Sequence, residues 1–214
     1  MNSRYQETFK TWNKIAKSYE DKFMNLDLYN ETYSIFCESI NKANASLLEI
    51  GCGPGNITKQ LLTKRPDFRI FGIDIAPNMI ALAKENNPTA KFDVMDCRKI
   101  NEIRENFEGI VCGFCLPYLS PSDCEKFFKD AYALLAENGL FYLSFVEGNP
   151  QNSGFQTGSS GDRVYFYYHS LEYIRDKIND FEFKESGVFY FDYAKSESEK
   201  ETHVILIVRK KTNI

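Results

Sequence analysis

The chain of 214 residues contains only two histidines and one tryptophan, and its basic residues do not outnumber its acidic ones. Lysine and arginine number 26 against 30 aspartate and glutamate residues, which gives a formal net charge of −4. Proteins that bind a nucleic-acid backbone are usually basic, because neutralising phosphates supplies much of their affinity. The composition therefore argues against a nucleic-acid partner. With no visible cluster of histidine and aspartate, the sequence also predicts no bound metal.

Long apolar runs and a secretory leader are missing as well. The longest charge-free apolar stretch, 109–119, is broken by Gly113 and Pro117. It falls well short of the roughly 20 residues that a membrane span needs. Residues 1–8 contain no apolar segment of the kind found in signal peptides. We therefore expect a cytoplasmic protein, a monomer or a homodimer, without a membrane partner.

The six cysteines lie inside apolar segments, which predicts reduced and buried thiols. Cys112 and Cys115 form a C-x-x-C pair, but residues three apart in a strand point to opposite faces of the sheet. Cys97 and Cys124 do not supply the second pair that a zinc site would need. A redox or metal role for these cysteines is therefore not expected.

Beside these absences, apolar strands alternate regularly with amphipathic helices. Residues 1–42 are expected to form a helical cap, with Trp12, Ile15, Ala16, Tyr19 and Phe23 on one helical stripe. Seven strands are expected at 46–50, 68–73, 90–95, 107–114, 139–146, 183–193 and 202–209. Repeated strand–helix units predict a parallel sheet with helices on both faces, and the short link between the last two strands predicts an antiparallel hairpin.

The predicted fold class is therefore α/β. It is a doubly wound, mostly parallel seven-stranded sheet with an antiparallel C-terminal hairpin and an N-terminal helical cap. We expect one domain over residues 1–214, with a core at 43–214. The stretch 148–162, rich in Gly, Ser, Asn and Gln, is the longest segment without predicted structure. We expect this loop and the helix bearing Trp12 and Tyr19 to close over a bound ligand.

A glycine-rich turn joins the first predicted strand to a helix. The segment from Glu49 to Asn56 reads EIGCGPGN and carries glycines at 51, 53 and 55. Glycines there let the chain turn sharply and let a ligand approach backbone atoms at the carboxyl ends of the strands. Asp74 ends the next strand, where a carboxylate can accept both hydroxyls of an adenosine ribose. The combination predicts an adenosine cofactor; the alternative is a tight turn without a ligand, with Asp74 as a helix cap.

This turn departs from the dinucleotide fingerprint G-x-G-x-x-G. The third glycine comes one residue early, and Pro54 removes a backbone N–H where a pyrophosphate needs donors. Glu49 places a carboxylate just before the turn, which suits an ammonium group rather than phosphates. The pattern therefore favours an adenosine cofactor that carries an amine.

Several segments, in order, resemble the motifs of class I (Rossmann-like) S-adenosylmethionine-dependent methyltransferases. The glycine turn is similar to the family's first motif, GIDIAPNM at 72–79 to its second-strand motif, and VMDC at 94–97 to its third-strand motif. Residues 107–111 and 138–143 resemble the fourth and fifth strands, and 12–24 resembles the N-terminal cap. The resemblance covers nearly the whole chain. It implies a methyltransferase whose cofactor is S-adenosyl-L-methionine.

The resemblance also implies roles for individual residues. Asp74 would bind the ribose hydroxyls, Asp96 the adenine amino group, and Tyr19 would close over the methionine part. The alternatives are ordinary packing for Ile75, Met79 and Phe114, and a loop-capping role for Asp96. The full predicted cofactor-binding set is Tyr19, Glu49, Gly51, Cys52, Gly53, Gly55, Asp74, Ile75, Met79, Asp96, Cys97, Gly113 and Phe114.

The acceptor side gives fewer signals. His169 follows the predicted loop and is the candidate catalytic base; the alternative is a hydrogen-bonded residue at the entrance of a helix. His203 lies in the apolar final strand and is expected to be structural. Neither an Asn/Asp-Pro-Pro-Tyr/Phe motif after the fourth strand nor the Pro-Cys nucleophile of cytosine-5 methyltransferases is present. We therefore expect in-line methyl transfer to a small molecule, aided by positioning and exclusion of water.

Two other functions stay open. An NAD-dependent oxidoreductase would keep Asp74 on the ribose, although the early third glycine and Pro54 argue against it. A non-catalytic accessory protein that binds the cofactor is the other, because the sequence establishes no catalytic residue on the acceptor side.

Overall fold

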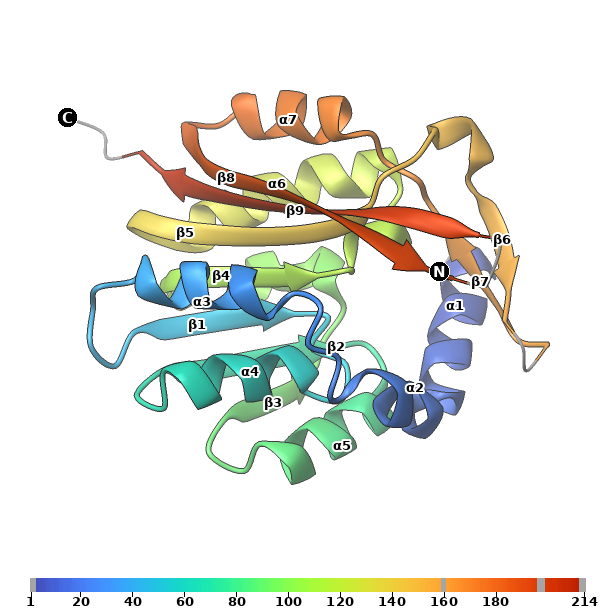
Figure 1. The fold of residues 1–214 in the computed structure, drawn as a ribbon, viewed down its shortest axis with the longest axis horizontal. Coiled ribbons are helices and arrows are strands. Elements are labelled where there is room, and N and C mark those ends of the chain that lie inside the picture. Colours follow the sequence, from blue (N-terminus) through green and yellow to red (C-terminus); the bar gives the residue numbers. More distant parts are fainter. Residues whose placement is uncertain (1–2, 159–160, 196–198, 212–214) are drawn as a thin grey trace.

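The computed structural model describes residues 3–158, 161–195 and 199–211, and its centre is a seven-stranded sheet (Figure 1). The strand order is β3-β2-β1-β4-β5-β9-β8. The first five strands in this order run parallel, β9 is antiparallel to β5, and β8 is antiparallel to β9. The strands are β1 (Ser46–Ile50), β2 (Arg69–Asp74), β3 (Lys91–Val94), β4 (Phe107–Gly113), β5 (Leu135–Val146), β8 (Phe183–Ala194) and β9 (Lys200–Lys210). The predicted fold class is confirmed.

Helices cover both faces of this sheet. On one face lie α3 (Asn30–Glu38) and α4 (Asn56–Lys64), and on the other α6 (Pro121–Leu134) and α7 (Leu171–Asn179), while α5 (Pro77–Asn86) packs against β2 and β3 (Figure 1). Neighbouring residues of β1 serve opposite faces: Leu47 packs with Phe36 of α3, and Leu48 belongs to the cluster of Phe127 in α6. A strand covered on both sides reads as a continuous apolar run, which is why β1 was identifiable in the sequence.

The N-terminal cap lies beyond the ends toward which the arrows of β1 and β4 point (Figure 1). It contains two helices, α1 (Ser3–Lys14) and α2 (Ala16–Phe23), where the sequence predicted one continuous stripe. The chain breaks at Ile15, whose φ and ψ are −93° and 10°. The break lets Ala16 pack on Ala76 and Met79 at the start of α5. Contacts with α5, which no helical periodicity reveals, therefore decide where α1 ends.

The segment predicted to lack structure contains short regular elements. It holds a 3₁₀ turn, η3 (Pro150–Asn152), and a strand, β6 (Gly154–Thr157), which pairs antiparallel with β7 (Arg163–Phe166) in a separate two-stranded sheet. Residues 159 and 160 lie outside the described part of the chain. Glycine and asparagine have low strand propensity, so this hairpin was not recognisable from composition. Two further 3₁₀ turns are η1 (Cys97–Glu102) and η2 (Leu116–Tyr118).

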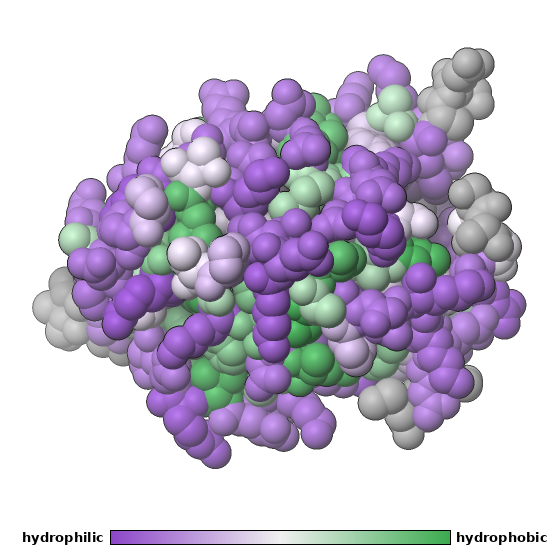
Figure 2. All heavy atoms as spheres, turned by 90° about the horizontal axis from the view of Figure 1, so that it is seen from below, coloured by the Kyte–Doolittle hydropathy of each residue, from purple (hydrophilic) through white to green (hydrophobic). Residues whose placement is uncertain are grey.

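The surface is mainly polar. Figure 2, which shows the underside of the view in Figure 1, is dominated by hydrophilic side chains with apolar ones visible between them. Within the described ranges, the large apolar side chains that are exposed are Val94, Phe155 and Tyr190. No helix in that part of the chain combines the length and the apolar character that crossing a membrane demands.

Candidate active site

The glycine turn directly follows the last residue of β1. Gly51 and Gly53 have φ values of 69° and 54°, in a region that residues with side chains rarely adopt. The Gly51 amide donates to the carbonyl oxygen of Ile73 at 2.8 Å, which holds the turn against the end of β2. A Cβ atom on Gly51 would lie 3.0 Å from the Cβ of Cys115. Both the backbone conformation and the close approach therefore require glycine.

Asp74, the last residue of β2, holds the same turn with its side chain. One carboxylate oxygen accepts the Gly53 N–H at 3.0 Å, and the other accepts the Ala76 N–H at 2.8 Å. Burial raises the pKa of Asp74, and these backbone donors act against that rise. Each oxygen of an ionised carboxylate can accept more than one hydrogen bond, so Asp74 keeps capacity for hydroxyl donors of a ligand.

A cavity lies between this turn and the cap, and we call it the turn cavity. Its floor comes from the ends of β1, β2 and β4, and its roof from α1 and α2. The Trp12 ring is edge-on to Tyr19 and Tyr118, with centroids 5.5 and 5.4 Å away, so aromatic rings close one side. The lining residues are Thr8, Phe9, Trp12, Tyr19, Gly51, Gly53, Asp74, Ile75, Met79, Met95, Asp96, Cys97, Arg98, Gly113, Phe114, Cys115, Tyr118 and Leu119.

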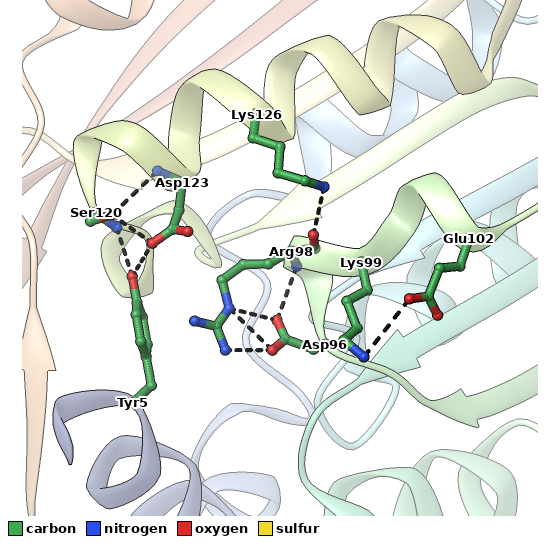
Figure 3. Close-up of polar contacts among 8 residues, drawn as sticks. All are labelled: Tyr5, Asp96, Arg98, Lys99, Glu102, Ser120, Asp123 and Lys126. Atoms are coloured by element: carbon green, nitrogen blue, oxygen red, sulfur yellow. Dashed lines mark hydrogen bonds and ion pairs between the residues drawn. The ribbon is translucent and has the colours of Figure 1, made fainter. Parts of the chain in front are cut away.

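At one end of the turn cavity, Asp96 is paired with Arg98 (Figure 3). The Asp96 carboxylate accepts the Arg98 backbone N–H at 3.0 Å and its Nε–H at 2.9 Å, and the guanidinium lies over the Tyr5 ring at 4.0 Å. Tyr5 in turn donates its hydroxyl to Asp123 at the start of α6. The acidic residue predicted to meet adenine is therefore fixed in place, with part of its accepting capacity already used by Arg98.

A second cavity adjoins the first on the side of the β8–β9 hairpin, and we call it the hairpin cavity. The two cavities share Trp12, Tyr19, Gly51, Gly113, Phe114 and Tyr118. The residues that line only the hairpin cavity are Phe23, Leu26, Tyr29, Tyr33, Asn56, Ile57, Gln60, Pro117, Val146, Phe166, Tyr193, Glu201 and His203. The site is thus a chamber with two connected parts, joined at the ends of β1 and β4.

Buried polar atoms without hydrogen-bond partners gather around this chamber. In the described part of the chain they include Trp12 Nε1, Glu49 Oε1 and His203 Nε2, and Trp12 and His203 line the cavities. Glu49 is 1% exposed, its other oxygen accepts the Thr58 hydroxyl, and burial raises its pKa to about 8. An unmet buried polar atom costs about 1–3 kcal/mol, so the chamber is built to receive polar groups of a ligand.

The structure brings most of the predicted cofactor-binding residues together. Ten of them line the turn cavity: Tyr19, Gly51, Gly53, Asp74, Ile75, Met79, Asp96, Cys97, Gly113 and Phe114. The other three, Glu49, Cys52 and Gly55, line neither cavity and lie in or directly before the glycine turn. Cys52 is buried, and Gly55 has φ 81° and a carbonyl that accepts the Asn87 amide at 3.0 Å. Direct contact of any of the thirteen with a cofactor stays a prediction.

The two histidines lie elsewhere than the sequence suggested: His203, and not His169, lines a cavity of the site. His169 lines neither cavity, is 2% exposed, and its Nε2 lies 3.1 Å from the Leu116 carbonyl oxygen. The structure thus places His169 as the hydrogen-bonded residue at the entrance of α7, the alternative that the sequence left open, and a role as catalytic base stays an untested prediction. His203, expected to be a structural residue, lines the hairpin cavity with an unpartnered Nε2.

Sequence reasoning missed the other side of the chamber. Met95 directly follows β3, a position that could have marked it, and Tyr118 lies at the end of η2, shortly after β4. Tyr29, Tyr193 and Glu201 lie far apart in the chain and meet only through the pairing of β8 with β9 beside α3, so no local signal reveals them.

Comparison with known proteins agrees with this geometry. Residues 47–139 match the family model described as a methyltransferase domain. The chain is 38% identical over 107 residues to trans-aconitate 2-methyltransferase of Variovorax paradoxus (strain S110), covering 50% of this chain and 40% of that protein. It is 32% identical over 142 residues to the tRNA N(3)-methylcytidine methyltransferase trm140 of Schizosaccharomyces pombe, covering 56% and 46%. The chain thus spans less than half the length of these two relatives.

The fold is shared with solved structures. The N-methyltransferase NodS from Bradyrhizobium japonicum WM9, in complex with S-adenosyl-L-homocysteine, superposes with a TM-score of 0.71. The two sequences are 15% identical, and the match covers 96% of this chain and 100% of NodS. At this identity the match establishes the common fold.

Proposed function

We propose that this chain, whose residues 47–139 belong to the methyltransferase domain family and whose fold is that of class I S-adenosylmethionine-dependent methyltransferases, transfers a methyl group from S-adenosyl-L-methionine to a small molecule. The match over residues 47–139 supports the predicted family. The observation that carries the proposal is the turn cavity, where a glycine-only turn, the Asp74 carboxylate and an aromatic roof converge.

The residues of the turn cavity fit this cofactor. Asp74 has lone pairs for the ribose hydroxyls, and the Asp96 carboxylate is a suitable acceptor for the adenine amino group. Ile75 and Met79 offer apolar surface for the adenine ring, and Gly51 and Gly53 allow the methionyl part to lie against the backbone. When bound, S-adenosyl-L-methionine supplies a methyl group on a positively charged sulfur.

The shared wall of the two cavities defines where transfer takes place. Gly113 and Phe114, at the end of β4, line both, so a reactive group in one cavity can reach an acceptor in the other only there. Trp12, Tyr19 and Tyr118 cover the same place and exclude water, which would otherwise compete for the methyl group. The protein contributes by aligning the cofactor with the acceptor and by excluding water at this junction.

A small molecule suits the acceptor side better than RNA does. The net charge is −4, and no lysine or arginine of the described chain lines the hairpin cavity, whereas RNA binding needs cations along the backbone path. Because one relative is a tRNA methyltransferase, we would incubate the protein with methyl-labelled cofactor and unmodified tRNA. We expect no label in the RNA; labelled tRNA would overturn the small-molecule acceptor.

Calorimetry with S-adenosyl-L-homocysteine tests the cofactor. Wild-type protein is expected to bind it, and Asp74→Ala is expected to weaken binding at least tenfold, because two charge-assisted hydrogen bonds are lost. Asp93→Ala, which removes an exposed carboxylate of β3, is the matched control and should bind as the wild type does. Absence of binding at millimolar concentration would reject the proposal, and tight NADH binding would favour an oxidoreductase.

A further inference from the structure

We propose that the methyl acceptor, bound in the hairpin cavity, is a flat, apolar molecule that bears a hydroxyl group or a neutral or cationic amine. We further propose that His203 takes the proton which this group loses. This inference rests on the proposed function. It assigns an acceptor class and a base to the part of the chamber that the cofactor does not fill.

The position of His203 is the first argument. It lies in β9, between Val146 at the end of β5 and Phe191 of β8, at the same edge of the sheet as the glycine turn. Its ring is 6% exposed, stacks on Tyr193 with centroids 4.7 Å apart at 12°, and lies 4.8 Å from the Phe114 ring. Phe114 also lines the turn cavity, so His203 is one side chain away from the site of transfer.

The two ring nitrogens of His203 have different surroundings. Nδ1 lies 2.5 Å from the Tyr29 hydroxyl oxygen, whereas Nε2 is buried without a hydrogen-bond partner. If Nδ1 carries the hydrogen and donates it to Tyr29, Nε2 has a free lone pair in a cavity wall. Such an arrangement, in which one nitrogen is oriented and the other is open, is what a general base requires.

Glu201 supplies the charge that a protonated His203 needs. The two residues are two apart in β9 and therefore share a face, and Glu201 Oε2 lies 3.8 Å from His203 Nε2. Lys195 donates to Glu201 at 2.9 Å, and both His203 and Lys195 lower the pKa of Glu201. An ionised Glu201 stabilises an imidazolium, and it also favours a cationic acceptor over an anionic one.

The rest of the wall decides the class of acceptor. Nine phenylalanine, tyrosine and tryptophan side chains line the cavity, among them Tyr29, Phe114 and Tyr193, and they offer flat faces to a planar apolar body. Glu201 is the charged side chain of the described lining, beside His203. Lys195 already pairs with Glu201, and no lysine or arginine of the described lining would pair with a carboxylate or phosphate of the acceptor, so acceptors that are methylated on an acid group are disfavoured.

An oxygen or nitrogen of the acceptor forms a bond to the methyl carbon, the carbon–sulfur bond breaks, and the sulfur keeps the electron pair. The acceptor loses one proton, which His203 Nε2 accepts beside Glu201; a cationic amine loses it before the attack, because an ammonium nitrogen has no lone pair. S-adenosyl-L-homocysteine leaves neutral at sulfur, and the proton later passes to solvent.

Nuclear magnetic resonance tests the assignment, because a chain with two histidines gives two imidazole Cε1–H signals. Either His169→Gln or His203→Gln alone tells the signals apart. We would add phenol, benzylamine and benzoate, at equal concentrations, to protein saturated with S-adenosyl-L-homocysteine. Phenol or benzylamine should shift the His203 signal, with benzoate having no effect, and the ¹⁵N shifts should show a protonated Nδ1. Benzoate acting as strongly as benzylamine, no shift with any probe, or a neutral ring protonated at Nε2 would overturn the proposal.

The kinetic test uses the probe that is methylated fastest. His203→Gln should lower kcat about 100-fold or more and remove the acidic limb of the pH profile, with the affinity for S-adenosyl-L-homocysteine unchanged. The titratable groups facing His203 are Tyr29, Tyr193 and Glu201, with Lys195 behind Glu201, and Glu201→Gln should shift that limb to lower pH. Asp192→Asn, an exposed carboxylate of β8, is the control.

Failure of this inference differs from failure of the proposed function. If S-adenosyl-L-homocysteine does not bind in calorimetry, the proposed function fails, and the same probes added without it still report on the cavity. If it binds and kcat is unchanged in His203→Gln, the base assignment is wrong and the methyltransferase remains.

Discussion

At the scale of single residues, Phe114 shows how the site is held in shape. It has a φ of 53°, an unusual value for an aromatic residue and one that costs about 1–3 kcal/mol. Its N–H donates to both the carbonyl oxygen and the hydroxyl of Ser144, at 3.1 and 3.0 Å. The ring thereby stands in the shared wall of the two cavities, against Tyr29 and His203. Such backbone strain is typical of functional sites, where the position of a side chain matters more than its contribution to stability.

Glu49 leads to a prediction about stability and pH. Its folded-state pKa is about 8, against an ordinary value of 4.5 when unfolded, so the folded chain holds a proton that the unfolded chain has lost between these values. Stability should therefore fall as pH rises through this window, by up to about 1.4 kcal/mol per pH unit. Urea titrations of wild type and Glu49→Gln at pH 5, 6.5 and 8 measure it. The free energy of unfolding of Glu49→Gln, relative to that of the wild type, should increase as pH rises. If this difference does not change with pH, Glu49 is ionised in the folded chain.

Gly51 allows a sharper test of the turn. Gly51→Ala forces a side chain into positive φ and against Cys115, and should cost about 1–3 kcal/mol of stability and weaken S-adenosyl-L-homocysteine binding. Gly154→Ala is the matched control, since a Cβ there meets no atom within 4 Å. Thermal unfolding and calorimetry report both effects. If the two variants have the same stability and the same affinity for S-adenosyl-L-homocysteine, the turn accommodates the added methyl group without cost.

The cofactor side of the site could be predicted from the sequence because its residues sit in short motifs at strand ends. Gly51, Gly53 and Asp74 are each within a few residues of the signal that marks them. His203 and Glu201 carry no such signal: they reach the chamber because β9 pairs with β5 on one side and β8 on the other. The position of His169 beside a polar loop suggested a catalytic base, but its ring packs against η2 and does not reach either cavity.

At the scale of elements, α1 and β7 behave as one unit. Thr8 and Thr11, one helical turn apart, satisfy the backbone of β7: Thr8 accepts the Tyr165 N–H at 2.9 Å, and Thr11 donates to the Arg163 carbonyl oxygen at 2.8 Å. Arg163 also pairs with Glu7. These contacts hold β7 in place, and β7 in turn pairs with β6, which forms within the polar, glycine-rich segment that was expected to lack structure. The side chains of α1 take the place of a third strand.

This unit should respond to the cofactor as a whole. Thr8, Phe9 and Trp12 of α1 line the turn cavity, so S-adenosyl-L-homocysteine should slow hydrogen exchange of α1 and β7 amides together. The α7 amides, on the far side of the sheet, are the internal control and should not change. Mass spectrometry of peptides with and without the ligand gives the comparison. Protection of α1 without protection of β7 would show that the two elements move separately.

At the scale of the whole molecule, the order β3-β2-β1-β4-β5 places the reversal of strand order between β1 and β4. Both cavities open there, as the general behaviour of open α/β sheets leads one to expect. The cap closes one side of that crevice and the antiparallel β8–β9 hairpin the other. The cofactor half therefore depends on the part of the fold that strand–helix alternation predicts, and the acceptor half on the C-terminal hairpin.

Because the turn cavity is lined by the cap helices and by residues at the ends of β1, β2 and β4, we expect cofactor binding to raise the stability of the molecule. At a concentration 100 times its dissociation constant, S-adenosyl-L-homocysteine should stabilise the folded state by about 2.7 kcal/mol and raise Tm by roughly 5–10 °C. NADH at the same concentration should leave Tm unchanged, since Pro54 and the early third glycine remove donors that a pyrophosphate needs. Asp74→Ala should abolish the rise. A shift with NADH as large as that with S-adenosyl-L-homocysteine would mean that the chamber recognises adenosine alone, and that the rest of the cofactor is chosen by something other than the glycine turn.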